Sequence, residues 1–133
     1  MYKIENKLNL IKKESDLQKL CCLYLELLKN QNKIIDYFAV PNGMKTGARN
    51  NYAYINSLKQ QGFKSGVSDL VIIFKSHVLF VELKIGRNKA SQLQQDFIAN
   101  ISKSLVCDGV IINDYDVFCL EIQNILDAEK EVK

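Results

Sequence analysis

The sequence predicts a single α/β domain in which helices flank a mixed central β-sheet. Two short apolar runs, 70–74 and 78–81, are joined by a polar turn, and this pattern predicts a β-hairpin. Before and after the hairpin, apolar residues recur at spacings of three and four, which predicts amphipathic helices. The resulting order is helix, strand, helix, hairpin, helix, strand, helix, an alternation typical of α/β domains.

The N-terminal half is predicted to form two helices and a strand. Residues 14–30 have one apolar face, and Ser15 or an adjacent residue can cap this helix. Residues 34–40 are a strand candidate that ends at a Pro-Asn-Gly turn, after which the chain is a polar loop. A short helix over 52–61, closed by Gly62, then leads to the hairpin.

The C-terminal half is predicted to add two helices and a strand. A Gly-Arg-Asn-Lys turn at 86–89 interrupts the second hairpin strand, and Ser91 can cap a helix over 92–105. Residues 110–112 are predicted to form a buried strand, and Asp116 can cap a last helix. We expect the apolar positions of that helix to be Val117, Leu120, Ile122 and Ile125.

Length and composition are those of one globular domain. The chain has 133 residues, of which 47% are hydrophobic and 25% charged. No apolar run of about 18 residues and no apolar signal segment is present, so no membrane association is expected. The four cysteines form no CxxC pair and there is one His, so we expect reduced, largely buried thiols in a cytoplasmic protein and no zinc site.

Ionisable residues flank the hairpin at one end. Asp69 precedes the first strand, and Glu82 and Lys84 close the second. The start of one hairpin strand lies across from the end of the other, so these side chains are expected to converge. Side chains alternate with period two, which puts Glu82 and Lys84 on one face and Leu83 on the other.

Two carboxylates and an ammonium group in this arrangement can bind a hard divalent cation and act on a phosphodiester. Charged residues at strand ends are also common, and on spacing alone a structural role explains them equally well. Polar residues that end an apolar run are costly to bury unpaired, which favours an ion or ligand between them.

Basic residues concentrate around this candidate site. The net charge is only +3, but residues 41–90 contain eight basic and two acidic residues, a local charge of +6 against −3 elsewhere. Such a distribution is typical of proteins that bind a polyanion. The alternative is a solvated surface on which lysines are scattered by chance.

Five short motifs follow one another along the chain. They are Glu14 with Gln18; Pro41-Asn42-Gly43 with Gly47-Ala48-Arg49; Gly66-Val67-Ser68-Asp69-Leu70; Phe80-Val81-Glu82-Leu83-Lys84; and Ser91-Gln92-Leu93-Gln94. In this order and spacing they resemble the VRR-Nuc family, the virus-type replication-repair branch of the PD-(D/E)xK nucleases. The resemblance extends from residue 14 to about 126. The family often has Pro at the positions of Ser65 and Ser68.

The resemblance implies a restriction-endonuclease-like fold with a bound Mg²⁺ or Mn²⁺. Asp69, Glu82 and the backbone carbonyl of Leu83 would be metal ligands. Glu14 would reach the metal directly or through water. The plainer interpretation of Glu14 is an acidic residue that favours the first turn of a helix through the helix dipole.

The resemblance also implies catalytic roles for Lys84 and Gln94. Lys84 would position and polarise the attacking water, and Gln94 would hydrogen-bond Lys84 or that water. A surface lysine and an exposed helix amide are the alternatives, and the neighbouring Gln95 makes the choice of glutamine open. Candidate phosphate contacts, with solvent-facing loop charge as their alternative, are Lys45, Arg49, Arg87 and Lys89.

The function that these features predict is metal-dependent hydrolysis of branched DNA by a homodimer, similar to Holliday-junction resolvases. A flap-directed or end-directed nuclease is the nearest alternative, and a DNA-binding module without catalysis is the alternative of another class. Tyr52 and Tyr54 could stack on an unpaired base, although a packing role is favoured. Small proteins of this type are expected in the cytoplasm of bacterial or phage-infected cells.

Overall fold

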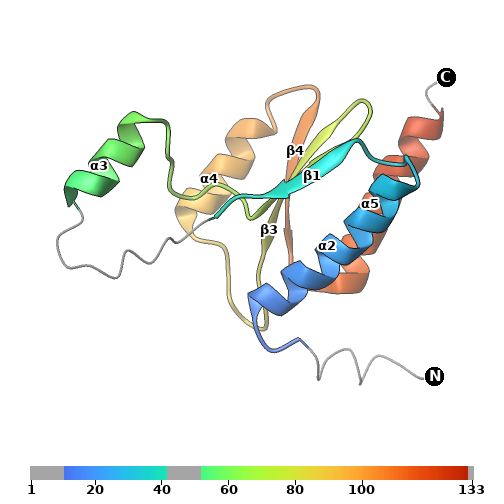
Figure 1. Ribbon diagram of the computed structural model, residues 1–133, viewed down its shortest axis with the longest axis horizontal. Coiled ribbons are helices and arrows are strands. Elements are labelled where there is room, and N and C mark those ends of the chain that lie inside the picture. Colours follow the sequence, from blue (N-terminus) through green and yellow to red (C-terminus); the bar gives the residue numbers. More distant parts are fainter. Residues whose placement is uncertain (1–10, 42–51, 132–133) are drawn as a thin grey trace.

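The computed structural model describes residues 11–41 and 52–131, which form one mixed β-sheet with helices on both faces (Figure 1). The sheet order is β1-β2-β3-β4, with β1–β2 and β2–β3 antiparallel and β3–β4 parallel. The strands are β1 (Asp36–Ala39), β2 (Leu70–Ile73), β3 (Val78–Leu83) and β4 (Cys107–Ile112). This confirms the predicted α/β class and the predicted hairpin.

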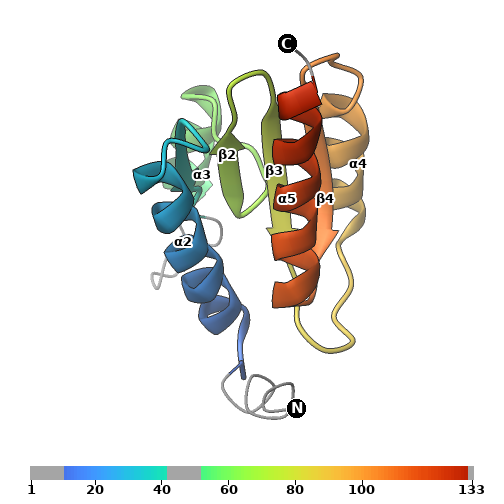
Figure 2. The ribbon, with the colours of Figure 1, turned by 90° about the vertical axis from the view of Figure 1, so that its right-hand side faces the viewer.

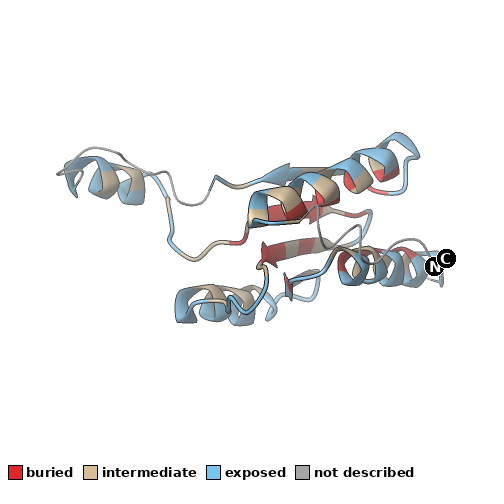
Figure 3. Ribbon diagram, turned by 90° about the horizontal axis from the view of Figure 1, so that it is seen from below, coloured by how far each residue is buried: buried red, intermediate tan, exposed pale blue. Residues whose placement is uncertain are grey.

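Two helices cover one face of the sheet. α2 (Glu14–Asn30) and α5 (Tyr115–Glu131) lie in front of the strands in Figure 2, with α4 (Gln92–Ile101) behind them. The buried residues of the two front helices and of the strands they cover form one core cluster, seen as the red positions of Figure 3. It includes Leu17, Cys21, Leu25, Leu28, Leu70, Ile72, Leu79, Val81, Leu83, Phe118, Ile122 and Leu126.

The opposite face is covered by α4 over β3 and β4. Phe97 of α4 meets Phe80 of β3 edge to face, with ring centroids 5.6 Å apart. A side chain at Gly109 of β4 would come within 2.9 Å of Ile98, so glycine there lets the helix approach the strand closely. This close approach brings the start of α4 to the end of the hairpin where the candidate site lies.

The apolar face predicted for the last helix is confirmed in part. Ile122 is buried and Ile125 packs against the core, but Val117 is 45% exposed and Leu120 is 61% exposed, and the other buried residues are Phe118 and Leu126. Each residue turns a helix by about 100°, so apolar residues on adjacent positions allow more than one face, and contact with α2 selects among them.

The capping residue of α5 differs from the one expected, whereas that of α2 is adjacent to Ser15, as expected. Asp114, not Asp116, caps α5, because its Oδ1 accepts hydrogen bonds from the amides of Asp116 (2.7 Å) and Val117 (3.1 Å). At the start of α2, the carboxylate of Asp16, next to Ser15, accepts from backbone amides just before the helix. Both capping groups are carboxylates placed where a helix leaves amides unpaired.

The predicted bounds of α4 and β4 were partly wrong. α4 begins after Ser91 as expected but ends at Ile101, and Leu105 is fully exposed. The amides of the Ser-Lys-Ser segment that follows bond back as turns, which stops the helix early. β4 begins at Cys107, and only its Ile112 is buried, because within residues 11–41 and 52–131 it pairs with a strand, β3, on one side alone.

α3 (Tyr52–Gln60) projects away from the sheet (Figure 1, left) and has no buried residue. Gly62 ends it in a left-handed conformation with φ +98°, as the sequence predicts. Tyr52 and Tyr54 are 80% and 47% exposed, so the favoured packing role for these rings is wrong. No helix of residues 11–41 and 52–131 is long and apolar enough to cross a membrane.

All four cysteines are free thiols, as expected. Cys21 is buried between α2 and the sheet, and burial raises its pKa to about 12. The other three are only half-buried, so the expectation of largely buried thiols holds fully for one of them.

Candidate active site

The hairpin register brings two carboxylates face to face. Leu70 pairs with Val81, and one further step along the ladder places Asp69 opposite Glu82. Directly opposed residues of an antiparallel pair point to the same face of the sheet. The amide of Leu83 donates to Asp69 Oδ2 at 2.8 Å, which holds this carboxylate against β3.

Glu82 is buried and its ionisation is perturbed. Its side chain is 2% exposed, and Lys84 Nζ lies 3.4 Å from its Oε1. Burial, and next the nearby Asp69 carboxylate, raise the pKa of Glu82 to about 7, while the Lys84 ammonium acts in the opposite direction. The site thus holds a carboxylate close to half-protonated at neutral pH, a perturbation typical of functional sites.

Gln94 is oriented toward this carboxylate by the start of α4. Its side-chain oxygen accepts a hydrogen bond from the backbone amide of Ser91 at 2.8 Å. Its backbone amide donates to Ser91 Oγ at 3.2 Å, and the two bonds form a capping box. The remaining Nε2 donates to Glu82 Oε1 at 2.6 Å. The sequence predicted Lys84 or a water as the partner of Gln94, so the observed partner is different.

The structure decides between the two adjacent glutamines. Gln95 is exposed, and its Nε2 donates to the carbonyl of Ala90 at 2.9 Å, outside the site. Lys84 is not a surface lysine either, because its side chain is only 14% exposed. These contacts form one group, hereafter the carboxylate site, at the open end of the hairpin, opposite its turn. Its members are Asp69, Glu82, Lys84 and Gln94.

Comparisons with known proteins agree with this architecture at the level of the fold. Neither a family model nor a curated protein matches the sequence. Among solved structures, one described as a "VRR_NUC domain protein" is similar over 84% of this chain and 86% of that chain, with a TM-score of 0.59 and 19% sequence identity. This chain has the VRR_NUC fold. The predicted restriction-endonuclease-like architecture is thereby confirmed.

Within the VRR_NUC fold, the oxygen atoms at the end of the hairpin suit a hard cation. Glu82 Oε2 is buried without a hydrogen-bond partner among the described residues. The Leu83 carbonyl lies on the same side of β3 as its amide, toward Asp69, because successive strand residues face alternate neighbours. Two carboxylates, one with an unpaired buried oxygen, and this carbonyl are a donor set that fits Mg²⁺ or Mn²⁺.

The structure does not group Glu14 with these candidate metal-binding oxygen atoms. It lies in the first turn of α2 and is half-buried. Across residues 11–41 and 52–131, no three His, Cys, Asp or Glu side chains are grouped so that they could hold a metal ion. Glu14 therefore stays a predicted metal ligand, in direct contact or through water, that the described geometry does not group with Asp69 and Glu82.

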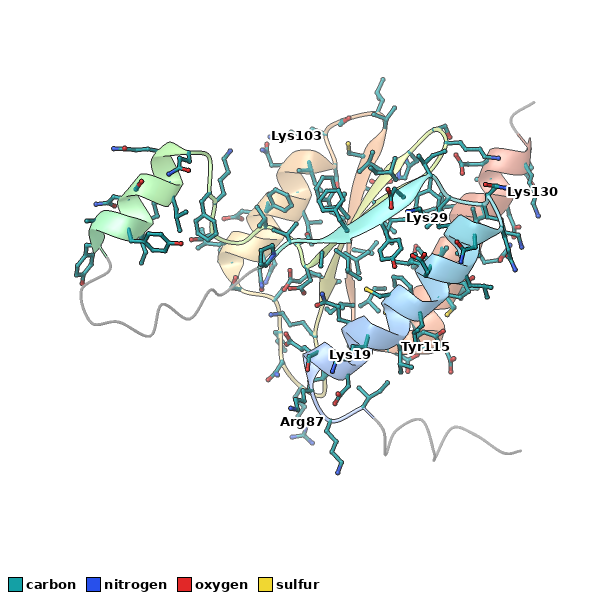
Figure 4. The ribbon with its side chains drawn as sticks, in the orientation of Figure 1. Lys19, Lys29, Arg87, Lys103, Tyr115 and Lys130 are labelled. Carbon is teal, nitrogen blue, oxygen red and sulfur yellow. The ribbon has the colours of Figure 1, made fainter. Side chains whose placement is uncertain are left out.

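The predicted phosphate contacts are only partly described. Arg87 and Lys89 are exposed in the turn that follows β3. Figure 4 shows Arg87 at the same end of the molecule as Lys19 of α2, away from Lys130 at the end of α5. Lys45 and Arg49, and most of the Pro-Asn-Gly loop, lie outside the described residues.

Gly66, three residues before Asp69, packs against the start of α4, which carries Gln94. Replacing Gly66 with Ala should destabilise the VRR_NUC fold. Its φ is +85°, and a Cβ there would come within 2.9 Å of the Leu93 backbone, one residue before Gln94. Strain and overpacking together should cost about 2–4 kcal/mol, measured by urea unfolding. Gly86→Ala is the matched control, since its φ is +58° but nothing lies within 4 Å. Equal losses in both variants would contradict the close packing.

The metal-free protein should become less stable as the pH rises from about 4.5 to about 7. Glu82 holds its proton more tightly when folded than at its usual pKa of 4.5, so ionisation above that value opposes folding. The loss should reach roughly 3 kcal/mol at most. Urea unfolding at pH 4.5, 6 and 8 in EDTA would measure it. Glu82→Gln should lose this part of the pH dependence, and an unchanged profile in that variant would contradict the assignment.

Proposed function

We propose that this protein is a metal-dependent endonuclease that hydrolyses phosphodiester bonds in DNA. The observation that carries the proposal is the carboxylate site. Asp69 lies opposite Glu82 on the neighbouring strand, and Glu82 is only 2% exposed. Lys84 and Gln94 both contact the same oxygen of Glu82. A purely structural ion pair would have no use for a second, half-buried carboxylate that opposes the ionisation of the first.

Asp69, Glu82 and the Leu83 carbonyl would hold the Mg²⁺ or Mn²⁺, with Glu14 acting through water. When bound, such an ion supplies positive charge to the phosphate oxygens and acidifies a coordinated water. The ion would also offset the repulsion between the two carboxylates, which the metal-free site relieves by protonating Glu82.

The other residues of the site act on the same centre. The Lys84 ammonium, held beside Glu82, would stabilise negative charge that develops on the phosphate and would position the attacking water. Gln94 fixes the rotamer of Glu82 and is itself fixed by Ser91, so the carboxylate is preorganised. Gln94 is a positioning residue in this scheme.

We further propose branched DNA as the substrate and a homodimer as the active form. A domain of this size with one site reaches one phosphodiester at a time, and a two-fold dimer would present two sites to the symmetric strands of a four-way junction. The structural neighbour with the VRR_NUC description supports nuclease activity as the class of function. Cleavage of flaps or ends is the nearest alternative substrate preference.

Labelled four-way junction, flap, duplex and single-stranded DNA, each with Mg²⁺, Mn²⁺ or EDTA, test the proposal. We expect cleavage only with metal, paired nicks in the junction and a dimer by sedimentation at micromolar concentration. Single nicks by a monomer would favour the flap or end-directed alternative. Binding without cleavage under every metal condition would leave the DNA-binding module as the better description.

Arg87→Ala should reduce the salt dependence of DNA binding. One lost phosphate contact lowers the slope of log K against log salt by about one. Lys130→Ala removes the same charge from an exposed position at another end of the molecule and is the matched control. Binding isotherms between 50 and 300 mM salt would measure both slopes. If the two variants have the same slope as the wild type, Arg87 does not contact the DNA.

A further inference from the structure

A row of apolar side chains crosses the sheet next to the carboxylate site. Phe38 of β1 pairs with Val71 of β2, which pairs with Phe80 of β3, so the three lie on one face. Two residues further along the strands, the same face carries Asp69 and Glu82. Two residues of a strand span about 6.6 Å, so the apolar row and the carboxylates are neighbours.

This row forms the floor of an open groove of about 300 Å³. Four phenylalanines line it, namely Phe38, Phe63, Phe80 and Phe97, and Ser68, the residue before Asp69, also contributes. α4 covers Phe80 through Phe97 but leaves Phe38 50% exposed, a large exposure for an aromatic side chain on a strand. Lys64, which is exposed, lies at the rim.

We propose that this groove binds one unstacked nucleobase of the DNA strand whose phosphate lies at the carboxylate site. The inference rests on the proposed nuclease function and narrows its substrate. Phenylalanine rings are platforms on which any base can stack, and a lysine at the rim suits the adjoining phosphate. A base inside a duplex cannot reach such a groove, so the preferred substrate has an unpaired nucleotide beside the cleaved bond.

The size of the groove suits a single base. Its volume of about 300 Å³ lies at the lower end of the range of small-molecule pockets. The strand register also puts Val71 and Phe80 of the groove two residues from Asp69 and Glu82 on the same face, so one DNA strand can contact both the groove and the carboxylate site. Junction branch points and flaps both supply such a nucleotide.

A binding cycle between protein and DNA tests the proposal. Flap DNA is prepared with an abasic site moved one position at a time through the unpaired strand and the branch point, and affinities are measured in EDTA. For the wild type, we expect one position at which loss of the base weakens binding about 5-fold to 100-fold. In Phe38→Ala, binding of intact DNA should weaken similarly and the abasic site should then have no further effect.

Leu120→Ala is the matched control, since Leu120 is an apolar side chain that is 61% exposed on α5, outside the groove. It should keep the abasic effect. Phe38→Leu keeps an apolar side chain, so it should fold even if Phe38→Ala does not, and it should lose most of the effect because the ring is gone. A flat abasic scan, or an effect lost in Leu120→Ala and kept in Phe38→Leu, would overturn the groove proposal.

The metal-dependent cleavage panel separates this outcome from failure of the nuclease proposal. A wild-type protein that cleaves DNA but shows a flat abasic scan contradicts only the base-binding groove. A protein that neither binds nor cleaves any of the DNA substrates contradicts both proposals.

Discussion

Asp69→Asn and Glu82→Gln are each expected to reduce DNA cleavage at least ~1,000-fold, because each would remove a charged ligand of the proposed cation that stabilises the reacting phosphate. Both replacements keep the shape of the side chain, and an Asn oxygen can still accept from the Leu83 amide. Single-turnover cleavage of labelled flap or junction DNA with Mg²⁺ or Mn²⁺ measures the loss.

The fold should survive these substitutions, since they relieve the repulsion between two carboxylates. Above pH 7 we expect Glu82→Gln to melt at the same temperature as the metal-free wild type or higher. Asp127→Asn on α5, an exposed position, is the matched control and should cleave normally. Near-normal cleavage by either site variant would remove Asp69 and Glu82 from the reaction.

Lys84→Ala is expected to lower the single-turnover rate by about 100-fold to 10,000-fold while changing DNA affinity little. The side chain is 14% exposed and directed at Glu82, so its charge acts at the reacting centre rather than along the DNA backbone. Loss of the ammonium should also raise the pKa of Glu82 further, since Lys84 now lowers it. The pH at which half-maximal cleavage is reached should then increase in this variant.

Lys103→Ala, an exposed lysine just beyond α4, serves as the control for loss of one positive charge. It should leave rate and pH profile unchanged. A Lys84→Ala variant with a normal single-turnover rate and a large binding defect would instead make Lys84 a phosphate contact.

The carboxylate site was largely predictable because its main residues lie on one hairpin. Strand alternation alone puts Glu82 and Lys84 on one face, and hairpin geometry puts Asp69 across from them. The capping role of Ser91 was also local and is confirmed. The partner of Gln94 was not predictable, because it depends on how closely α4 approaches β3, and that approach requires glycine at positions 66 and 109.

The sequence also mispredicted features that depend on packing between elements far apart along the chain. The buried face of α5 follows from its contact with α2, and the partial exposure of β4 follows from its edge position. The aromatic groove was not recognised in the sequence, since Phe38 and Phe80 are joined only through the register of three strands. The signal for it would have been two aromatic residues at matching positions. Phe80 lies two residues before Glu82, and Phe38 lies two residues before Val40, whose amide donates to the Asp69 carbonyl.

The central claim is that Asp69 and Glu82 hold a divalent cation, and calorimetric titration of the DNA-free protein with Mn²⁺ tests it most directly. We expect one site per chain that is lost in Asp69→Asn and in Glu82→Gln, is kept in Asp127→Asn, and weakens as the pH falls from 8 to 6 because Glu82 must give up its proton. Equal Mn²⁺ binding by the wild type and both site variants, or no binding by the wild type at pH 8, would contradict the claim.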